Sequence, residues 1–401
     1  MGDVFSFLKN STLSRSELNY ESGKFKYIHY GDILTKFGDI TDTCNFSVPF
    51  VTTPEKVIKL EKYFLQNGDV IIADTAEDSM VGKVTEIQNS DPFPTVSGLH
   101  TIPVRPNKEF AAGFLGHYMN APFYHDQLFK LMQGVKVLSL SKNAVIQTKI
   151  NSPSYCEQNL ISRTIDLIDG TITLHEEKKR QLERLKSALL QKMFADKSGY
   201  PAVRFKGFDD IWNQEKLNSL VRLHRGLTYS PNNVQDSGIR VLRSSNILDG
   251  KFVMTDDDIF VKSSVVNIPT VKNGDILITA ANGSIKLVGK HAIISGISEN
   301  TAVSGGFMLV GSSRIPNFVN SLFGTSWYQR FIRKYVTGGN GSIGNLKKND
   351  FDKQYVMVPT TSEQERIGEF LKKIDQLIIN NQIKHEKLLE LKKSLLQNMF
   401  I

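Results

Sequence analysis

The sequence predicts an α+β protein in which two strand-rich globular domains are joined by two long antiparallel helices forming a coiled coil, with internal pseudo-two-fold symmetry. Three observations predict this fold. A stretch of 38 residues occurs twice, at 157–194 and 363–400, with a constant offset of 206 and no gap. Both copies place apolar residues at steps of three and four, the pattern of a helix with one apolar stripe. The segments before the copies alternate short apolar runs with turn signals, which is typical of strands.

The predicted domain boundaries follow this repeat. Residues 1–156 are expected to form the first strand-rich domain, and residues 157–194 the first long helix. Residues 195–362 contain a connector and the second strand-rich domain, and residues 363–401 form the second long helix. A chain of 401 residues is too long for one ordinary core, and two similar halves suit this length.

The two globular segments are diverged copies of each other. The sequence Asn-Gly-Asp at 67–69 returns at 273–275 with the offset 206, and Val-Ser-Gly at 96–98 returns at 303–305 with the offset 207. The frame is therefore kept while the residues around it differ. A duplicated frame with different loops suits a protein that reads two different things with one architecture.

The two apolar stripes are predicted to pack against each other. A single helix would leave its narrow apolar stripe exposed to water, so the two helices are expected to cover each other's stripes. Two matching stripes can pack with local two-fold symmetry only if the helices run antiparallel. The seam is not purely apolar, because polar residues fill stripe positions at His175, Lys179 and Lys186 on the first helix and at Asn381, His385 and Lys392 on the second. The predicted seam consists of Ile161, Ile165, Ile168, Ile172, Leu182 and Leu189 on the first helix, and Ile367, Leu371, Ile374, Ile378, Leu388 and Leu395 on the second.

Composition bounds the class of protein. No apolar run reaches the length of a membrane span and no secretory signal opens the chain, so we expect no membrane partner. Cys44 and Cys156 lie far apart, which excludes a disulfide framework and makes a reducing cytoplasm the default location. The net charge of +8 weakly favours a polyanionic partner.

No catalytic pattern emerges from the sequence. The Gly-Lys pairs at 82–83 and 289–290 lack the spacing of a phosphate-binding loop. There is no glycine fingerprint for a dinucleotide and no cluster with metal-ligand spacing, so we expect neither a cofactor nor a metal. The acidic run at 256–258 is interpreted as a solvated turn.

Several motifs together resemble the specificity subunit of type I restriction-modification enzymes. The sequence Pro-Thr-Thr-Ser-Glu-Gln at 359–364 leads into the second helix, and Asn-Gly-Asp-Ile-Leu-Ile at 273–278 precedes a polar loop. Gly338-Gly339 precedes Asn345-Leu346, and Val-Arg-Phe-Lys-Gly-Phe at 203–208 precedes Trp212. The likeness covers nearly the whole chain and depends on the order and duplication of the motifs.

The resemblance implies a non-catalytic subunit that binds double-stranded DNA. By this likeness, each globular domain is a target recognition domain that reads one half of a bipartite, asymmetric DNA site. The helices would set the spacing and dock two methyltransferase (modification) subunits, and a restriction and translocase subunit would join that core. The methyltransferase and endonuclease activities would reside in those other subunits.

One feature departs from the family pattern. The second domain is preceded by the Arg-Phe-Lys-Gly-Phe segment and Trp212, whereas the first domain has no such lead. A shortened or internally started chain would explain the missing lead, and the sequence leaves open whether the short N-terminus is native or truncated. The first helix also contains Gly170, which costs about 1 kcal/mol relative to alanine.

Three pairs of segments carry the residue types that contact DNA. Base edges are read by side chains with forked or paired donors and acceptors, and phosphates by lysine, arginine, hydroxyl and backbone amide groups. Such residues gather after the Asn-Gly-Asp strands, before Leu140 and Leu346, and near His29 and its equivalent segment. The predicted contacts are Tyr30, Thr75, Ser79, Lys83, Lys136, Ser139 and Lys142 in the first domain, and Arg243, Ser244, Asn246, Asn282, Ser284, Lys286, Asn340, Ser342, Asn345 and Lys347 in the second.

Two other functions remain open from the sequence. The chain could be a structural coiled-coil interaction protein that binds no DNA, or a DNA-modifying enzyme with an uncharacterised site. Salt-dependent DNA binding separates the first alternative from the specificity subunit, since phosphate contacts weaken with salt. An activity assay of the isolated chain with Mg²⁺ and a methyl donor separates the second.

Overall fold

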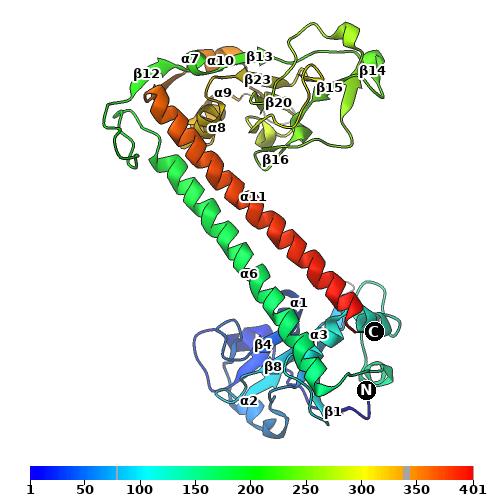
Figure 1. Cartoon of the computed structure of the whole chain (residues 1–401). Helices are drawn as coiled ribbons and strands as arrows, with labels where there is room; N and C mark the ends of the chain where they lie inside the picture. Colours follow the sequence, from blue (N-terminus) through cyan, green and yellow to red (C-terminus); the bar gives the residue numbers. More distant parts are fainter. Residues whose placement is uncertain (78–79, 337–343, 401) are drawn as a thin grey trace. The chain divides into compact units, whose positions relative to one another are not determined.

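The computed structural model describes residues 1–77, 80–336 and 344–400 (Figure 1). It divides into two compact units, the first formed by Met1–Glu176 with Ile383–Ile401 and the second by Glu177–Gln382. Helices α6 (Tyr155–Lys192) and α11 (Thr361–Asn398) each have 38 residues and contribute to both units. In the described part of the chain, no helix has a stretch that is both long and apolar enough to span a bilayer.

The first unit contains two larger sheets. One has the strand order β1 (Phe5–Phe7), β10 (Thr101–Pro106), β6 (Val70–Ala73), β8 (Val84–Gln88), β4 (Ile40–Asp42). The other has the order β2 (Leu18–Asn19), β5 (Phe50–Val51), β3 (Lys26–Ile28), β9 (Thr95–Ser97). Neighbouring strands are antiparallel except for the pairs β4–β8 and β3–β9. The helices besides α6 and α11 are α1 (Tyr30–Thr35), α2 (Glu55–Ile58), α3 (Phe114–Asn120), α4 (Pro122–Phe129) and α5 (Lys142–Gln147).

The second unit repeats this plan. One sheet has the order β13 (Arg222–Arg225), β23 (Met308–Ser312), β19 (Ile276–Thr279), β21 (His291–Ile293), and the other β14 (Val234–Gln235), β18 (Ile259–Val261), β15 (Ile239–Leu242), β22 (Ala302–Ser304). Smaller ladders join β12 (Asn213–Lys216) to β25 (Tyr355–Val358), and β16 (Ile247–Leu248) to β17 (Lys251–Phe252). The remaining helices are α7 (Leu217–Leu220), α8 (Pro316–Phe323), α9 (Ser326–Tyr335) and α10 (Lys348–Asp352).

The strands β6 and β19 are the buried centres of the two units. All four residues of each strand are buried, and each strand lies between two antiparallel neighbours. Alternate side chains of β6 enter different cores: Val70 and Ile72 pack in the cluster with α3 and α4, whereas Ile71 and Ala73 pack in the cluster with Ile33. A strand covered on both faces needs a continuous apolar run, which explains why both Asn-Gly-Asp motifs lead into one.

The two long helices run antiparallel in the first unit. Lys392 Nζ of α11 lies 2.7 Å from Asp169 Oδ2 of α6, and His385 Nε2 lies 2.8 Å from Glu176 Oε1. As residue numbers rise along α6 they fall along α11. The predicted antiparallel arrangement is therefore confirmed.

An ion pair of the second unit repeats one from the first. Lys186 Nζ lies 2.5 Å from Asp375 Oδ1. At the offset of 206, Lys186 is the counterpart of Lys392 and Asp375 the counterpart of Asp169. Lys186 and Lys392 thus form equivalent ion pairs with the other long helix, as the predicted pseudo-two-fold symmetry requires.

The apolar stripes are shared between the helix seam and the globular domains. Ile161 and Ile165 pack in the core of the first domain, and Ile367 and Leu371 pack with Phe318 of α8. The beginning of each helix packs in one cluster with its own globular domain and with the end of the other long helix, so the stripe does not serve the coiled coil alone. Of the predicted seam residues, those in the first half of each helix are buried and the remaining four are partly buried: Leu182, Leu189, Leu388 and Leu395.

An ion network around the buried side chain of His117 fixes the first domain to both helices. His117 of α3 lies between two carboxylates, with Nδ1 2.9 Å from Asp39 Oδ2 and Nε2 3.0 Å from Asp166 Oδ1. Lys392 reaches the same Asp39 carboxylate at 3.4 Å and also pairs with Asp169. Burial by itself would lower the pKa of His117, but the hydrogen bonds and charges of the two aspartates raise it to about 9.

The second domain is attached by a different ion pair. Arg204 of the connector donates from Nε and Nη2 to the two carboxylate oxygens of Glu363, at 2.7 and 2.8 Å. Glu363 is buried, whereas its counterpart Glu157 in α6 is exposed. The Arg-Phe-Lys-Gly-Phe segment therefore supplies the partner of the glutamate that opens α11.

Candidate nucleic-acid interface

In the first domain, the two loops predicted to contact DNA are joined by a short ladder. β7 (Thr75–Ala76) pairs antiparallel with β11 (Leu138–Ser139), and Thr75 lies opposite Ser139. The backbone N–H of Leu140 donates to the carbonyl of Asp74 at 2.8 Å, which continues the ladder. Loops some 60 residues apart in sequence therefore form one surface.

The second domain has the same ladder with other residues. β20 (Ala281–Asn282) pairs antiparallel with β24 (Gly344–Asn345), and Ala281 lies opposite Asn345. The N–H of Leu346 donates to the carbonyl of Ala280 at 2.8 Å. Because Asp74 and Leu140 match these two residues at the offset 206, the two ladders are equivalent.

The third predicted segment also reaches the ladder in both domains. The ring of Tyr30 lies edge-on to that of His100 at 5.3 Å, and His100 Nδ1 lies 3.5 Å from Thr75 Oγ1. In the second domain, Asn282 Nδ2 donates to Ser244 Oγ at 3.2 Å. The structure thus brings the three separately predicted groups together in each domain.

One pair of residues at the ladders was missed by the sequence analysis. The carbonyl of His100 accepts from the N–H of Asp74, and the carbonyl of Phe307 accepts from the N–H of Ala280. Phe307 is 65% exposed, and the His100 side chain is 48% exposed. The signal was present, since both residues stand two positions after the repeated Val-Ser-Gly sequence.

Most of the other predicted contacts lie at the surface near these ladders. Lys136, Ser139 and Lys142 are exposed in the first domain, as are Ser284, Lys286 and Lys347 in the second. Three predicted residues lie outside the described residues: Ser79, Asn340 and Ser342.

Three predicted contacts are instead used inside their own domain. Lys83 Nζ donates to the carbonyls of Leu34 and Phe37, each at 3.2 Å, and burial lowers the pKa of Lys83. Asn246 is fully buried, and its amide nitrogen donates to the carbonyl of Val253 at 3.0 Å. The geometry gives these two side chains a structural role that loop composition does not reveal.

Arg243 is also engaged within the second domain. Its Nη2 donates to the backbone carbonyl of Asp257 at 2.5 Å and to a carboxylate oxygen of the same residue at 3.1 Å. The neighbouring Asp258 side chain is 1% exposed and pairs with Arg240 and Asn246. The interpretation of the acidic run at 256–258 as a solvated turn was therefore wrong for Asp258. Its carboxylate is buried because Arg240 and Asn246, which lie outside the run, both bond to it.

One group of described residues has ligand types that a metal could use. Single ligand atoms of Asp39, His117 and Asp169 lie within 4.8 Å of one another. The ammonium of Lys392 already lies against both of these carboxylates, at 3.4 and 2.7 Å. A cation supplied by the chain thus compensates their charge, and the group is an ion network of the fold.

Comparison with protein families gives a match over both halves of the chain. The family model described as the type I restriction modification DNA specificity domain matches residues 1–184 and again residues 204–391. The chain is 23% identical over 339 residues to the specificity subunit of type I restriction enzyme EcoKI from Escherichia coli K12, covering 82% of this chain and 71% of that protein. It is 21% identical over 421 residues to the putative type I restriction enzyme MjaX specificity subunit of Methanocaldococcus jannaschii, covering 98% and 90%.

Solved structures show the same fold. The S subunit of a type I restriction-modification system from M. genitalium matches with a TM-score of 0.59 at 12% identity, covering 100% of this chain and 94% of that one. A chain from a structural study of complex assembly and conformational transition in the type I restriction-modification system matches with a TM-score of 0.52 at 16% identity, covering 99% and 97%. At these identities the likeness is one of fold.

Proposed function

The chain belongs to the family of type I restriction-modification DNA specificity proteins, and we propose that each of its globular domains reads one half of a bipartite, asymmetric DNA site. In this proposal the chain selects the sequence, and the methyltransferase and endonuclease reactions take place in other subunits. The family match and the fold support this function, and nothing favours a coiled-coil protein without DNA or an unfamiliar enzyme.

One observation carries the proposal: the same ladder holds different side chains in the two domains. Ser139 corresponds to Asn345, and His100 to Phe307. A serine hydroxyl offers one donor with acceptor capacity, whereas an asparagine amide can bond two atoms of an adenine edge at once. Equivalent positions with different chemistry should read different bases, so we expect two unlike half-sites.

The long helices are proposed to set the distance between the half-sites. Each has 38 residues and, at 1.5 Å per residue, is roughly 57 Å long. One turn of DNA is about 34–36 Å. The helices are therefore long enough to hold two half-sites apart with an unread spacer between them.

The helices are also proposed to dock two methyltransferase subunits, with a restriction and translocase subunit joining the complex. Leu160, Leu167 and Leu174 of α6 are 67%, 73% and 63% exposed and stand seven residues apart, so they share one face. Leu377 and Leu391 of α11 are also exposed and lie two heptads apart. Replacing Leu167 by Glu should abolish co-purification of the methyltransferase subunits without loss of helix content. Retained co-purification would contradict this docking surface.

The proposed function is tested by mapping methylated bases in genomic DNA. The methyltransferase subunit is expressed in one strain with this chain and in another without it, and both genomes are sequenced for methylation. We expect one bipartite, asymmetric motif that appears only with the chain. An unchanged methylation pattern, or a continuous symmetric motif, would contradict the proposal.

A further inference from the structure

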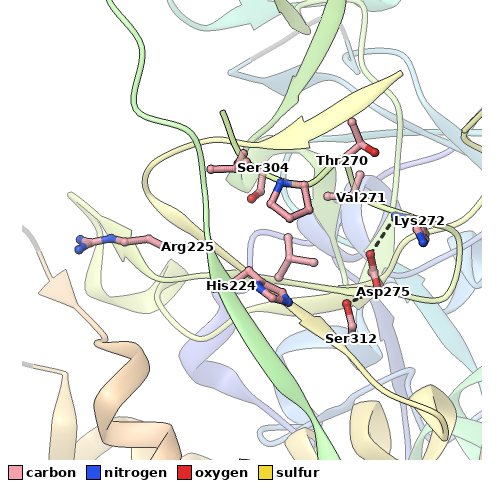
Figure 2. Close-up of a pocket in the computed structure, with 11 residues that line it drawn as sticks. His224, Arg225, Thr270, Val271, Lys272, Asp275, Ser304 and Ser312 are labelled. Atoms are coloured by element: carbon pink, nitrogen blue, oxygen red, sulfur yellow. Dashed lines mark hydrogen bonds between the residues drawn. The ribbon is translucent and has the colours of Figure 1, made fainter. Parts of the chain in front are cut away.

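A cavity of about 260 Å³ opens at one edge of the second domain (Figure 2). Among the described residues, Asp275 is the one acidic residue of its lining. The polar and basic lining residues are Ser312, Thr270, Ser304, His224, Arg225 and Lys272. Asp275 precedes strand β19 and Asn282 follows it. The four residues of β19 span roughly 13 Å at about 3.3 Å per residue, so the cavity and the ladder proposed to contact DNA lie at opposite ends of this strand.

In the first domain, the equivalent place is filled by an arginine. Arg105 donates from Nε and Nη2 to the two carboxylate oxygens of Asp69, at 2.8 and 2.6 Å. Nη2 also donates to the carbonyl of Phe64 at 2.8 Å. The Asp69 side chain is only 1% exposed as a result. A forked guanidinium on a carboxylate is among the strongest pairings that side chains make.

Asp275 is the counterpart of Asp69. The two residues stand at the offset of 206, each at the end of an Asn-Gly-Asp sequence before a central strand. Each carboxylate also accepts a backbone N–H from the residue three positions earlier, Gln66 in the first domain and Lys272 in the second, both at 2.8 Å.

Ser312 is the counterpart of Arg105. Val104 lies opposite the first residue of β6, and Gly311 lies opposite the first residue of β19, so the next residues on the two strands correspond. Ser312 Oγ donates to Asp275 Oδ1 at 2.8 Å (Figure 2). A serine is much shorter than an arginine, and the cavity occupies the space that the longer side chain fills in the first domain.

Thr270 completes the correspondence, because it stands at the offset of 206 from Phe64, whose carbonyl accepts from Arg105. The nearby Arg225 does not fill the place, since its side chain points away from the other labelled residues (Figure 2). The cavity therefore keeps the carboxylate, as Asp275, and a residue at the position of Phe64, as Thr270. It lacks a guanidinium like that of Arg105, which bonds the Asp69 carboxylate and the Phe64 carbonyl in the first domain.

We propose that this cavity is a binding site for a guanidinium group, presented as an arginine side chain by another polypeptide. The planar fork would bond the Asp275 carboxylate, whose oxygens are held in place by Ser312 and Lys272 N–H. Lysine is a weaker fit, because its compact ammonium cannot bond both oxygens in one plane. The site lies outside the proposed DNA surface and is independent of the half-site model.

The test uses the full chain and ethylguanidinium as the probe, with ethylammonium as a control for charge alone. Hydrogen exchange is followed by mass spectrometry in peptides covering 268–275. We expect a saturable slowing of exchange with ethylguanidinium and none with ethylammonium. Asp275→Asn should abolish the effect, and Ser312→Arg should slow exchange without the probe and make the protein insensitive to it.

The first domain provides a matched gain of function. Arg105→Ser should open an equivalent cavity and speed exchange in peptides covering 64–69, and ethylguanidinium should restore the slow exchange there. No saturable effect at 268–275 in the wild-type chain, an equal effect of ethylammonium, or an effect that survives Asp275→Asn would overturn the proposal. N-acetylarginine amide resembles an arginine within a polypeptide. Slower exchange with free arginine but not with N-acetylarginine amide would overturn the proposal that the guanidinium comes from another polypeptide.

Discussion

Replacing His117 by Gln should make the stability of the first unit much less dependent on pH between about pH 6.5 and 9. The imidazole is 1% exposed and lies between Asp39 and Asp166. Asp39 is shared with Lys392, which also pairs with Asp169. A glutamine can keep a hydrogen bond here but cannot carry the positive charge that these carboxylates hold in place.

The magnitude follows from the pKa of His117, which the fold raises from 6.5 to about 9. At about 1.36 kcal/mol per pKa unit, the folded state gains about 3 kcal/mol from binding this proton more tightly than the unfolded chain does. Because the pKa is raised on folding, this stabilisation is fully present below pH 6.5. It is lost as the pH rises towards 9 and the folded protein also releases the proton.

The assay is hydrogen exchange in peptides covering α3, corrected for the pH dependence of intrinsic exchange. Both tryptophans, Trp212 and Trp327, belong to the second unit, so their fluorescence would not report on this site. The difference in opening free energy between wild type and His117→Gln should be largest near pH 6 and shrink by about 3 kcal/mol towards pH 9. A difference that stays constant over this range would refute the reasoning.

His291 in the second unit is the matched control. Burial lowers the pKa of His291, despite its hydrogen bond to Asn320. A histidine whose pKa is lowered on folding contributes stability above its unfolded pKa and loses it as the pH falls. His291→Gln should therefore affect the second unit with the opposite pH dependence. The same sign for both variants would show that the effect does not come from the environments of the two rings.

Three further predictions concern the helices. Leu371→Asp should cost several kcal/mol by burying an unpaired charge, whereas Leu377→Asp at a 48% exposed position should cost little, as urea unfolding would show. Gly170→Ala should stabilise the chain by about 1 kcal/mol, since the added Cβ meets nothing within 4 Å. Gly368→Ala should destabilise the chain, since the added Cβ would lie 2.7 Å from the backbone nitrogen of Phe318. Equal shifts in melting temperature for the two variants would contradict this prediction. Truncation after residue 194 should give a homodimer through the freed stripe of α6, and a strictly monomeric fragment in light scattering would count against it.

The repeated frame could be predicted from the sequence because its signals are local and occur twice. The matched stripes, which contain Ile165 on the first helix and Ile374 on the second, predicted the antiparallel helices, and both residues are buried. Thr75 and Ser139 were predicted as DNA contacts from two loops whose positions recur in both domains, and the structure places these residues opposite each other in one ladder. Here the identity of single residues mattered less than their constant offset.

Roles that depend on partners distant in the sequence could not be predicted. Asn246 has the composition of a DNA contact, but its amide is buried against a neighbouring hairpin. His117 looks isolated in the sequence, since Asp39 and Asp166 lie far from it along the chain and only the fold brings them to its ring nitrogens. The exchange of Arg105 for Ser312 becomes visible only once the strand registers fix which residues correspond.

The central claim is that the two domains read separate halves of one DNA site, and the matched ladder residues test it most directly. Asn345→Ser and Ser139→Asn each give one ladder the residue of the other. The methylation motif of each variant is sequenced in cells with the methyltransferase subunit. We predict that Asn345→Ser changes the bases in one half-site only, and that Ser139→Asn changes the bases in the other half-site only. Either substitution changing the bases on both sides of the spacer, or neither changing any base, would contradict the two-reader account.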